Sequence, residues 1–224
     1  VRALDLCCGT GTITVRLDEG LGQGSTIVAV DASEAMIAQA RRKVSGRVEF
    51  RVSDVLQALK ACRAEEFDVV TCGWAIGYMP VKRFLREVLR VLKPGGMLGI
   101  IENRKDTLSA IRTTGLAVMR RYPRHIQYLM DLTLRLPASG VQLETWMKGA
   151  GFTVRQVWDG SIDFKFSSGK DVLDWVLHTG ASAGFDRIMD PSVKTLCDVA
   201  FIEIIEKKQE QLCERTRECK SVSK

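Results

Sequence analysis

A short glycine-containing loop and an aspartate stand where two apolar runs of the sequence end. The loop is Asp5–Gly11, with glycines at positions 9 and 11, between an apolar run and a helical stretch. Glycine allows a ligand to approach the backbone closely, and amides at a helix start can receive an anion. Asp31 ends the next apolar run, where its carboxylate can accept both hydroxyls of a ribose. The spacing indicates a nucleotide-containing ligand lying across the ends of these runs.

Two kinds of ligand compete for this loop. A nicotinamide dinucleotide site has a third glycine three residues after Gly11, where this chain has Thr14. Asp31 suits either ligand, because dinucleotide sites also carry an acidic residue about 20 positions downstream of the loop. The missing glycine favours a ligand other than a dinucleotide.

Strands and helices must place these residues at one edge of the fold. Short, continuous apolar runs predict buried parallel strands, and the stretches between them repeat with the period of a helix. The predicted strands are 1–6, 25–30, 47–52, 67–72 and 97–101, and the predicted helices are 12–18, 33–44, 55–62 and 81–92. Strands that alternate with helices indicate a parallel, doubly wound α/β sheet.

The second half of the chain follows a different pattern. Residues 104–137 contain two helical pieces split near Pro123, and Ser139-x-x-Gln142 is typical of a helix-capping box. Two strands and two further helices are predicted at 152–158, 162–166, 169–180 and 191–215. Asp159-Gly160 lies between the two strands and is typical of a hairpin turn.

Five stretches resemble the ordered motifs of class I S-adenosylmethionine-dependent methyltransferases, in the broad type-11 group that acts on small molecules. They are Ala3–Gly11, Val28–Asp31, Val52–Val55, Phe67–Cys72 and Leu89–Gly96. The resemblance implies a doubly wound, mostly parallel, seven-stranded Rossmann-like sheet with a helical cover over the substrate. The seventh strand is either 162–166 or missing. One domain over 1–224 is implied, with a cofactor-binding core at 1–102, a helical insert at 103–138 and a sheet edge with helices at 139–224.

The same resemblance implies that the ligand is S-adenosyl-L-methionine and assigns residues to it by position. Gly9 and Gly11 would flank its methionine part, and Asp31 would hold its ribose. Asp54 would accept from the adenine amino group. Cys7 stands where the family usually has its first glycine. Further cofactor contacts are implied for Asp5, Cys7, Ala32, Met36, Val55, Cys72 and Gly73.

Methyl transfer needs a general base only if the acceptor must lose a proton. Many members of the group carry a histidine where Gly77 stands, so this chain lacks that base. The remaining candidates for a base are Tyr78, Glu102, His125, Tyr122 and Tyr128, and those for contact with the acceptor are Trp74, Tyr78 and Tyr122. The resemblance implies a small-molecule acceptor that is acidic, quinone-like or carrier-bound.

Composition narrows the range of partners. The net charge of +6 and the pI of 9.0 permit an anionic partner, but basic residues on helical stretches are typical of solvated faces. There is no dense basic-aromatic tract of the kind that binds nucleic acid. No apolar run is long enough to span a bilayer, so we expect a cytoplasmic protein. The spacing of the cysteines matches no metal site.

Two alternatives stay open. One is a methyltransferase that acts on RNA or protein, although Cys72–Ala75 replaces the Pro-Pro-aromatic segment with which many such enzymes grip an amino group. The other is a paralogue that binds S-adenosylmethionine without catalysis, since no clear base is evident. The sequence carries no indication of the oligomeric state.

Overall fold

The computed structural model describes residues 1–44, 46–127, 135–179 and 188–221, with side chains up to residue 208. The chain divides into two compact units. The first comprises 1–105 and 133–159, and the second comprises 106–132 and 160–224. The expectation of one domain over the whole chain stays a prediction.

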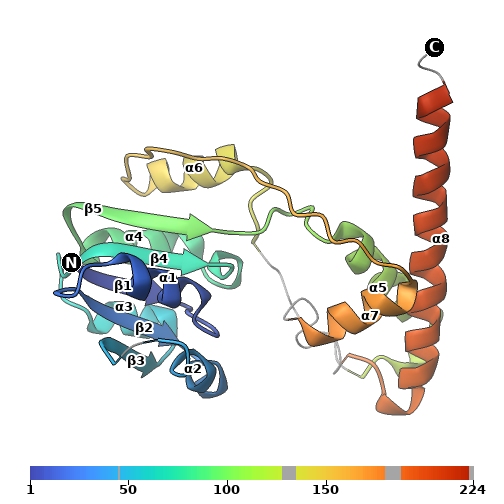
Figure 1. Cartoon of the computed structure of the whole chain (residues 1–224), viewed down its shortest axis with the longest axis horizontal. Coiled ribbons are helices and arrows are strands. Elements are labelled where there is room, and N and C mark those ends of the chain that lie inside the picture. The colour runs from blue at the N-terminus through green and yellow to red at the C-terminus, as the bar shows by residue number, and fades with distance from the viewer. Residues whose placement is uncertain (45, 128–134, 180–187, 222–224) are drawn as a thin grey trace. The chain divides into compact units, whose positions relative to one another are not determined.

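Five parallel strands form the sheet of the first unit, in the order β3-β2-β1-β4-β5 (Figure 1). They are β1 (Arg2–Leu6), β2 (Thr26–Asp31), β3 (Val48–Val52), β4 (Phe67–Gly73) and β5 (Leu92–Ile101). All five strands were predicted, although β5 begins at Leu92 rather than at 97. The connections lead outward in opposite directions from β1 and β4, and such a switch point leaves a crevice at the carboxyl ends of the strands.

Helices cover both faces of this sheet. The helices of the first unit are α1 (Thr12–Gly20), α2 (Glu34–Ala40), α3 (Val55–Ala61), η1 (Ile76–Tyr78), α4 (Val81–Val91) and α6 (Gly140–Gly149). Leu59 of α3 and Phe84 of α4 are fully buried in one core cluster with Leu4. Ile37 of α2 packs in a second cluster with Ala29. Because neighbouring strand residues face opposite sides, these clusters confirm a doubly wound fold.

The predicted helix caps are present. The Ser33 hydroxyl accepts a hydrogen bond from the Met36 amide, and the Ser139 hydroxyl accepts one from the Gln142 amide, both at 3.3 Å. The side chain of Gln142 accepts in turn from the Ala138 amide at 2.7 Å. The serine half of the predicted capping box is thus confirmed, whereas the Gln142 side chain accepts the amide of the residue before the cap and not that of Ser139 itself.

Helices build the second unit. They are α5 (Ser109–Arg121), η2 (Pro123–His125), α7 (Gly169–His178), η5 (Pro191–Val193) and α8 (Lys194–Ser221). Val118, Val172 and Phe201, from α5, α7 and α8, are buried in a common core. The predicted split near Pro123 is confirmed, whereas a cover over the substrate stays a prediction. In the part of the chain that the structure describes, no helix has the length and apolarity to cross a membrane.

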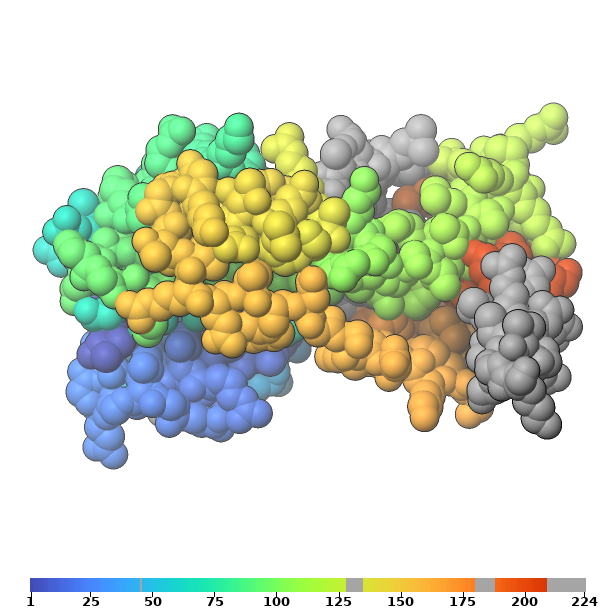
Figure 2. Space-filling model, turned by 90° about the horizontal axis from the view of Figure 1, so that it is seen from above, coloured from blue at the N-terminus to red at the C-terminus, as the bar shows by residue number. Residues whose placement is uncertain are grey.

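The predicted strands at 152–158 and 162–166 are wrong, because both segments lack strand structure. They belong to different units, so they do not form the hairpin that Asp159-Gly160 suggested. Phe152 still packs against the core, but the apolar side of the pattern is exposed further along, since Trp158 and Ile162 are 72% and 81% exposed. Within the described residues the sheet therefore has five strands. Within the first unit, Figure 2 shows α6 and residues 150–159, in yellow to light orange, against the green segment.

Candidate functional site

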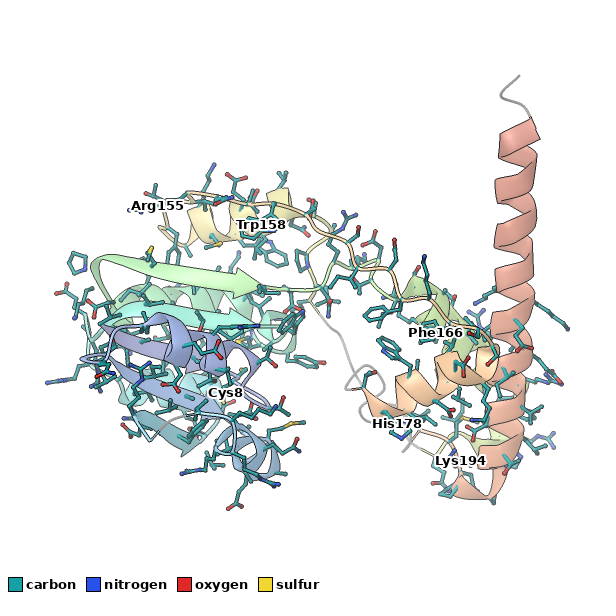
Figure 3. All side chains as sticks on the ribbon, viewed as in Figure 1. Cys8, Arg155, Trp158, Phe166, His178 and Lys194 are labelled. Atoms are coloured by element: carbon teal, nitrogen blue, oxygen red, sulfur yellow. The ribbon has the colours of Figure 1, made fainter. Side chains whose placement is uncertain are left out.

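A cavity of about 600 Å³ lies at the carboxyl ends of β1 to β4, within the first unit. Its volume is in the range of small-molecule and cofactor pockets. The wall nearest β1 is formed by the loop that follows this strand, in which Cys8 is labelled in Figure 3. The crevice predicted from the strand order is thus a pocket in the folded chain.

Three residues in the left-handed backbone conformation shape the loop after β1. Cys7, Gly9 and Gly11 all have positive φ angles, of 56°, 53° and 85°. A Cβ at Gly9 would meet no atom within 4 Å, and Gly9 lines the cavity, so its missing side chain leaves open space for a ligand. Cys7 also lines the cavity, in a conformation that costs a residue with a Cβ about 1–2 kcal/mol. The loop keeps the shape of a glycine loop despite the cysteine.

Asp31 is fixed at the end of β2 by two backbone amides. Its Oδ2 accepts from Gly9 and its Oδ1 accepts from Ser33, each at 2.8 Å. Each carboxylate oxygen can accept two hydrogen bonds, so one site on each oxygen stays available to a ligand. Asp31 therefore presents two neighbouring acceptors to the cavity that it lines.

Asp54 combines a structural role with an available acceptor. Its Oδ1 caps α3 by accepting from the amides of Leu56 and Gln57, at 2.9 and 3.1 Å. Its Oδ2 accepts neither of these bonds, and Asp54 lines the cavity together with the adjacent Val55. Ala32 and Met36 line the same part, where Met36 is 40% exposed. Helix capping and ligand binding are thus compatible roles for Asp54.

Asp5 is buried beneath the glycine loop and receives two hydroxyl groups. Thr14 donates to its Oδ2 at 2.6 Å, and Thr71 donates to its Oδ1 at 2.8 Å. Thr14 itself is fully buried. The residue that replaces the third glycine of a dinucleotide site is therefore the partner of a buried carboxylate, and it ties α1 to β1. The sequence showed this departure but not its purpose.

Asp5→Asn is expected to change how the free energy of unfolding depends on pH. Burial raises the pKa of Asp5 above its ordinary value of 3.8, so the folded chain binds this proton more tightly than the unfolded chain. The protonated group favours the folded state at low pH, and that advantage is lost as the pH rises from 3.8 through the raised folded value. Urea unfolding from about pH 4 to about pH 8 should show the variant gaining stability relative to the wild type with rising pH. A constant difference would contradict the burial argument.

The end of β4, which pairs with β1, forms a further wall of the cavity next to the start of α1. Gly73 lines the cavity, and a Cβ there would overlap the Cδ1 of Ile13. Trp74 and Tyr78 follow in the same wall and are 48% and 68% exposed. Both are aromatic residues that the sequence assigned to the acceptor, and the structure brings them to the cavity that Asp31 lines.

The thiols of Cys8 and Cys72 stay protonated. Burial raises the pKa of the Cys8 thiol to about 12. A hydrogen bond with Cys7, together with burial, raises the pKa of the Cys72 thiol. A thiol is a nucleophile or a metal ligand only as the thiolate, so these side chains act as small apolar groups. Among the described residues, no group of three His, Cys, Asp or Glu side chains could hold a metal ion.

The candidate bases belong to different elements and to both units. Tyr78 lines the cavity, whereas Glu102 lies at the end of β5 and accepts from the amides of Gly77 and Asn103. Tyr122 and His125 belong to the second unit, where Tyr122 packs against the helical core. The other predicted residues outside the lining set are Gly11, which packs against Ala40, and Cys72, which is buried; Tyr128 lies outside the described residues.

Several lining residues were missed by the sequence analysis. Thr10, Thr12 and Ile13 come from the glycine loop and the start of α1, and Ser53 precedes Asp54. Their positions next to predicted ligand residues were a usable signal. Met79 follows the β4 loop and could not be assigned without knowing the path of that loop.

The donor and acceptor pattern of the cavity fits S-adenosylmethionine. The two available acceptors of Asp31 match a ribose diol, and the Oδ2 of Asp54 matches an amino group on a purine. The open space in front of Gly9 can admit an extended chain close to the backbone. The ribose and the adenine of the cofactor therefore match acceptors in the cavity, and its methionine part has room next to the backbone of Gly9.

Comparisons with known proteins agree with this fit. Residues 3–96 match the model of a methyltransferase domain. The demethylmenaquinone methyltransferase of Shouchella clausii (strain KSM-K16) is 34% identical over 149 residues, which are 65% of this chain and 60% of that protein. The corresponding enzyme of Lactobacillus johnsonii (strain CNCM I-12250 / La1 / NCC 533) is 29% identical over 57% of this chain and 54% of that protein. The chain thus spans less than two thirds of the length of these relatives.

A solved structure shares the fold. A candidate methyltransferase from Bacillus halodurans C-125 superposes with a TM-score of 0.52 at 24% identity, over 69% of this chain and 64% of that one. All the residues that line the cavity lie within the segment that matches the domain model. On this evidence residues 3–96 carry a methyltransferase domain, and the cavity within that segment fits S-adenosyl-L-methionine.

Proposed function

We propose that this chain transfers the methyl group of S-adenosylmethionine to a small, ring-bearing acceptor of the quinone type. The observation that carries the proposal is that Trp74 and Tyr78 line the same cavity as Asp31 and Asp54. The exposed face of an aromatic side chain can stack on a flat ring. The quinone type is supported by the relatives, which are named demethylmenaquinone methyltransferases.

In this proposal different lining residues bind the two parts of the cofactor. Asp31 and Asp54 hold the adenosine part of the cofactor, and the backbone at Gly9 and Gly73 leaves room for its methionine part. The cofactor supplies a methyl group that its sulfonium has already activated. The chain therefore contributes alignment of the acceptor with that methyl group, which lowers the barrier without a covalent step on the protein.

A reduced, hydroquinone-type acceptor fits the small number of bases at this site. The hydroxyl of such a ring resembles a phenol, whose pKa is about 10, so it loses its proton without a strong base. The electron pair of the phenolate would form the bond from the ring carbon to the methyl group as the S–CH3 bond breaks and S-adenosylhomocysteine leaves. Loss of the proton of that carbon to solvent would then restore the aromatic ring. The Tyr78 hydroxyl, from the wall of the cavity, can hydrogen-bond to the acceptor oxygen.

The proposal is tested by incubating the chain with methyl-labelled S-adenosylmethionine and a short-chain demethylmenaquinol. Mass spectrometry should detect a quinone that has gained one methyl group. A metabolite extract in a parallel reaction reports other acceptors. Label in a different small molecule, in protein or in RNA would overturn the quinone assignment. Cofactor binding with no labelled product in either reaction would identify a non-catalytic binding protein instead.

Trp74→Ala is expected to raise the KM for the acceptor about tenfold, because stacking contributes about 0.5–1.5 kcal/mol and 1.4 kcal/mol corresponds to a factor of ten. The KM for S-adenosylmethionine should change much less. Trp158→Ala is the matched control, since Trp158 belongs to the same unit, is 72% exposed and lies outside the cavity lining. Equal acceptor KM values for the two variants would contradict the place of Trp74 in acceptor binding.

A further inference from the structure

The segment after β4 that lines the cavity is hydrogen-bonded to two successive residues, Ile101 at the end of β5 and Glu102 directly after it. The Trp74 amide donates to the carbonyl of Ile101 at 2.7 Å. The Gly77 amide donates to Oε2 of Glu102 at 3.2 Å, while Oε1 of Glu102 accepts from the Asn103 amide at 2.8 Å. The first of these bonds continues the sheet ladder. The second depends on a side chain and is therefore open to mutation.

The peptide at Gly77 is also held from its other side. Its carbonyl accepts from the Arg135 amide at 3.0 Å. A Cβ at Gly77 would come within 2.8 Å of Cδ2 of Leu136. The contact atom is the end of a flexible side chain, so a residue larger than glycine at this position would require the Leu136 side chain to shift.

The wall contains backbone strain that these contacts must hold. Trp74 has a φ of +54°, in the left-handed region, which costs about 1–2 kcal/mol for a residue with a Cβ. Such a conformation persists only where the surrounding contacts determine it. The Trp74 amide is bonded to Ile101 and the Gly77 amide to Glu102. Loss of the Glu102 bond therefore removes one of the contacts that hold this segment and leaves the bond from Arg135 to the Gly77 carbonyl.

Glu102 has the surroundings of an anchoring group and not those of a base. It is not among the residues that line the cavity, and both of its oxygens accept backbone amides. Burial raises its pKa, although the amides of Asn103 and Gly77 oppose that rise. A carboxylate used in this way acts on a ligand through the loop that it holds.

We propose that Glu102 is a positioning residue, whose carboxylate holds the segment 74–79 in the conformation that presents Trp74 and Tyr78 to the cavity. Its influence on the acceptor rests on the proposed function. Its influence on the loop does not, and the two are measured separately.

The loop is tested by hydrogen–deuterium exchange of the full chain, followed by mass spectrometry of peptides that cover 73–80. Glu102→Ala should speed exchange at the Gly77 amide at least tenfold, with no change in β1 to β3. Glu102→Gln keeps one acceptor oxygen but no charge, so about threefold faster exchange is expected, since bonds to charged groups are about twice as strong as neutral ones. Glu66→Ala is the matched control, because Glu66 also accepts a backbone amide, from Arg63 at 2.8 Å, at a distance from the cavity lining.

Kinetics supply the second readout. Glu102→Ala should raise the KM for short-chain demethylmenaquinol about tenfold, while the Kd for S-adenosylhomocysteine stays within about twofold of the wild type. Glu102→Gln should recover part of the KM, which a general loss of stability would not produce.

Wild-type exchange rates at 74–79 in Glu102→Ala would overturn the proposal, and if that variant does not fold, unchanged rates in Glu102→Gln would overturn it equally. Absence of methylation by the wild type would remove the proposed function and leave the exchange result to decide the role of Glu102.

Discussion

Replacing Asp31 with alanine is expected to weaken the binding of S-adenosylhomocysteine by about 100-fold or more. The carboxylate offers one free acceptor on each oxygen to the ribose hydroxyls, and a hydrogen bond to a charged group contributes about 1.5–3 kcal/mol. Two such bonds sum to about 3 kcal/mol at least, and every 1.4 kcal/mol is a factor of ten in Kd. Isothermal calorimetry measures the change directly.

The Asp31 experiment needs a control for folding, because Asp31 also accepts the amides of Gly9 and Ser33. Circular dichroism should show that the variant keeps its helices and strands before its affinity is interpreted. Asp68→Ala is the matched variant, since Asp68 lies near the opposite end of β4 and pairs with Lys93 away from the cavity. Unchanged affinity in a folded Asp31→Ala protein would remove the basis of the cofactor assignment.

Gly11→Ala is expected to destabilise the first unit by about 2–4 kcal/mol. A φ of +85° costs a residue with a Cβ about 1–2 kcal/mol. The new Cβ would also lie 2.9 Å from Cβ and 3.2 Å from Cα of Ala40, atoms of the α2 backbone region that cannot rotate away, and overpacking of this kind adds about 1–3 kcal/mol. Thermal unfolding followed by circular dichroism should show a midpoint lower by roughly 5–10 °C.

Gly24→Ala is the matched comparison for Gly11, because a Cβ at Gly24 would meet no atom within 4 Å. Its expected effect is within about 0.5 kcal/mol, as for most surface substitutions. Equal midpoints for the two variants would mean that α1 and α2 can separate at Gly11 without cost. That result would also remove the packing explanation for this glycine.

The sheet and the polar residues at its edge could be predicted because local sequence determines them. Apolar runs mark the central strands, and a residue at the end of a parallel strand lies at the carboxyl edge of the sheet. Asp31 was therefore predicted from its position and Asp54 from the family resemblance, and both line the cavity. The hairpin after 152 was predicted from an equally regular pattern, but that pattern has no information about which unit each half joins.

Contacts between segments that are far apart in the sequence could not be predicted from it. The role of Thr14 depends on the burial of Asp5, which only the packing of α1 against the sheet reveals. The role of Glu102 depends on the path of the loop after β4. Tyr122 and His125 were attractive for their chemistry, yet their helices belong to a unit whose core is formed with α7 and α8. Residue type suggested the candidates, and the packing shows to which unit each of them belongs.

The route of the polypeptide between its two units limits how the protein can be dissected. The chain passes from one unit to the other three times, after 105, after 132 and after 159. Neither unit is a continuous stretch, so no truncation from one end leaves either unit complete and alone. An isolated cofactor-binding piece instead requires excision of the middle and a new join. The Lys105 amide already donates to the Pro137 carbonyl at 2.8 Å, so a linker of a few residues is long enough to make that join.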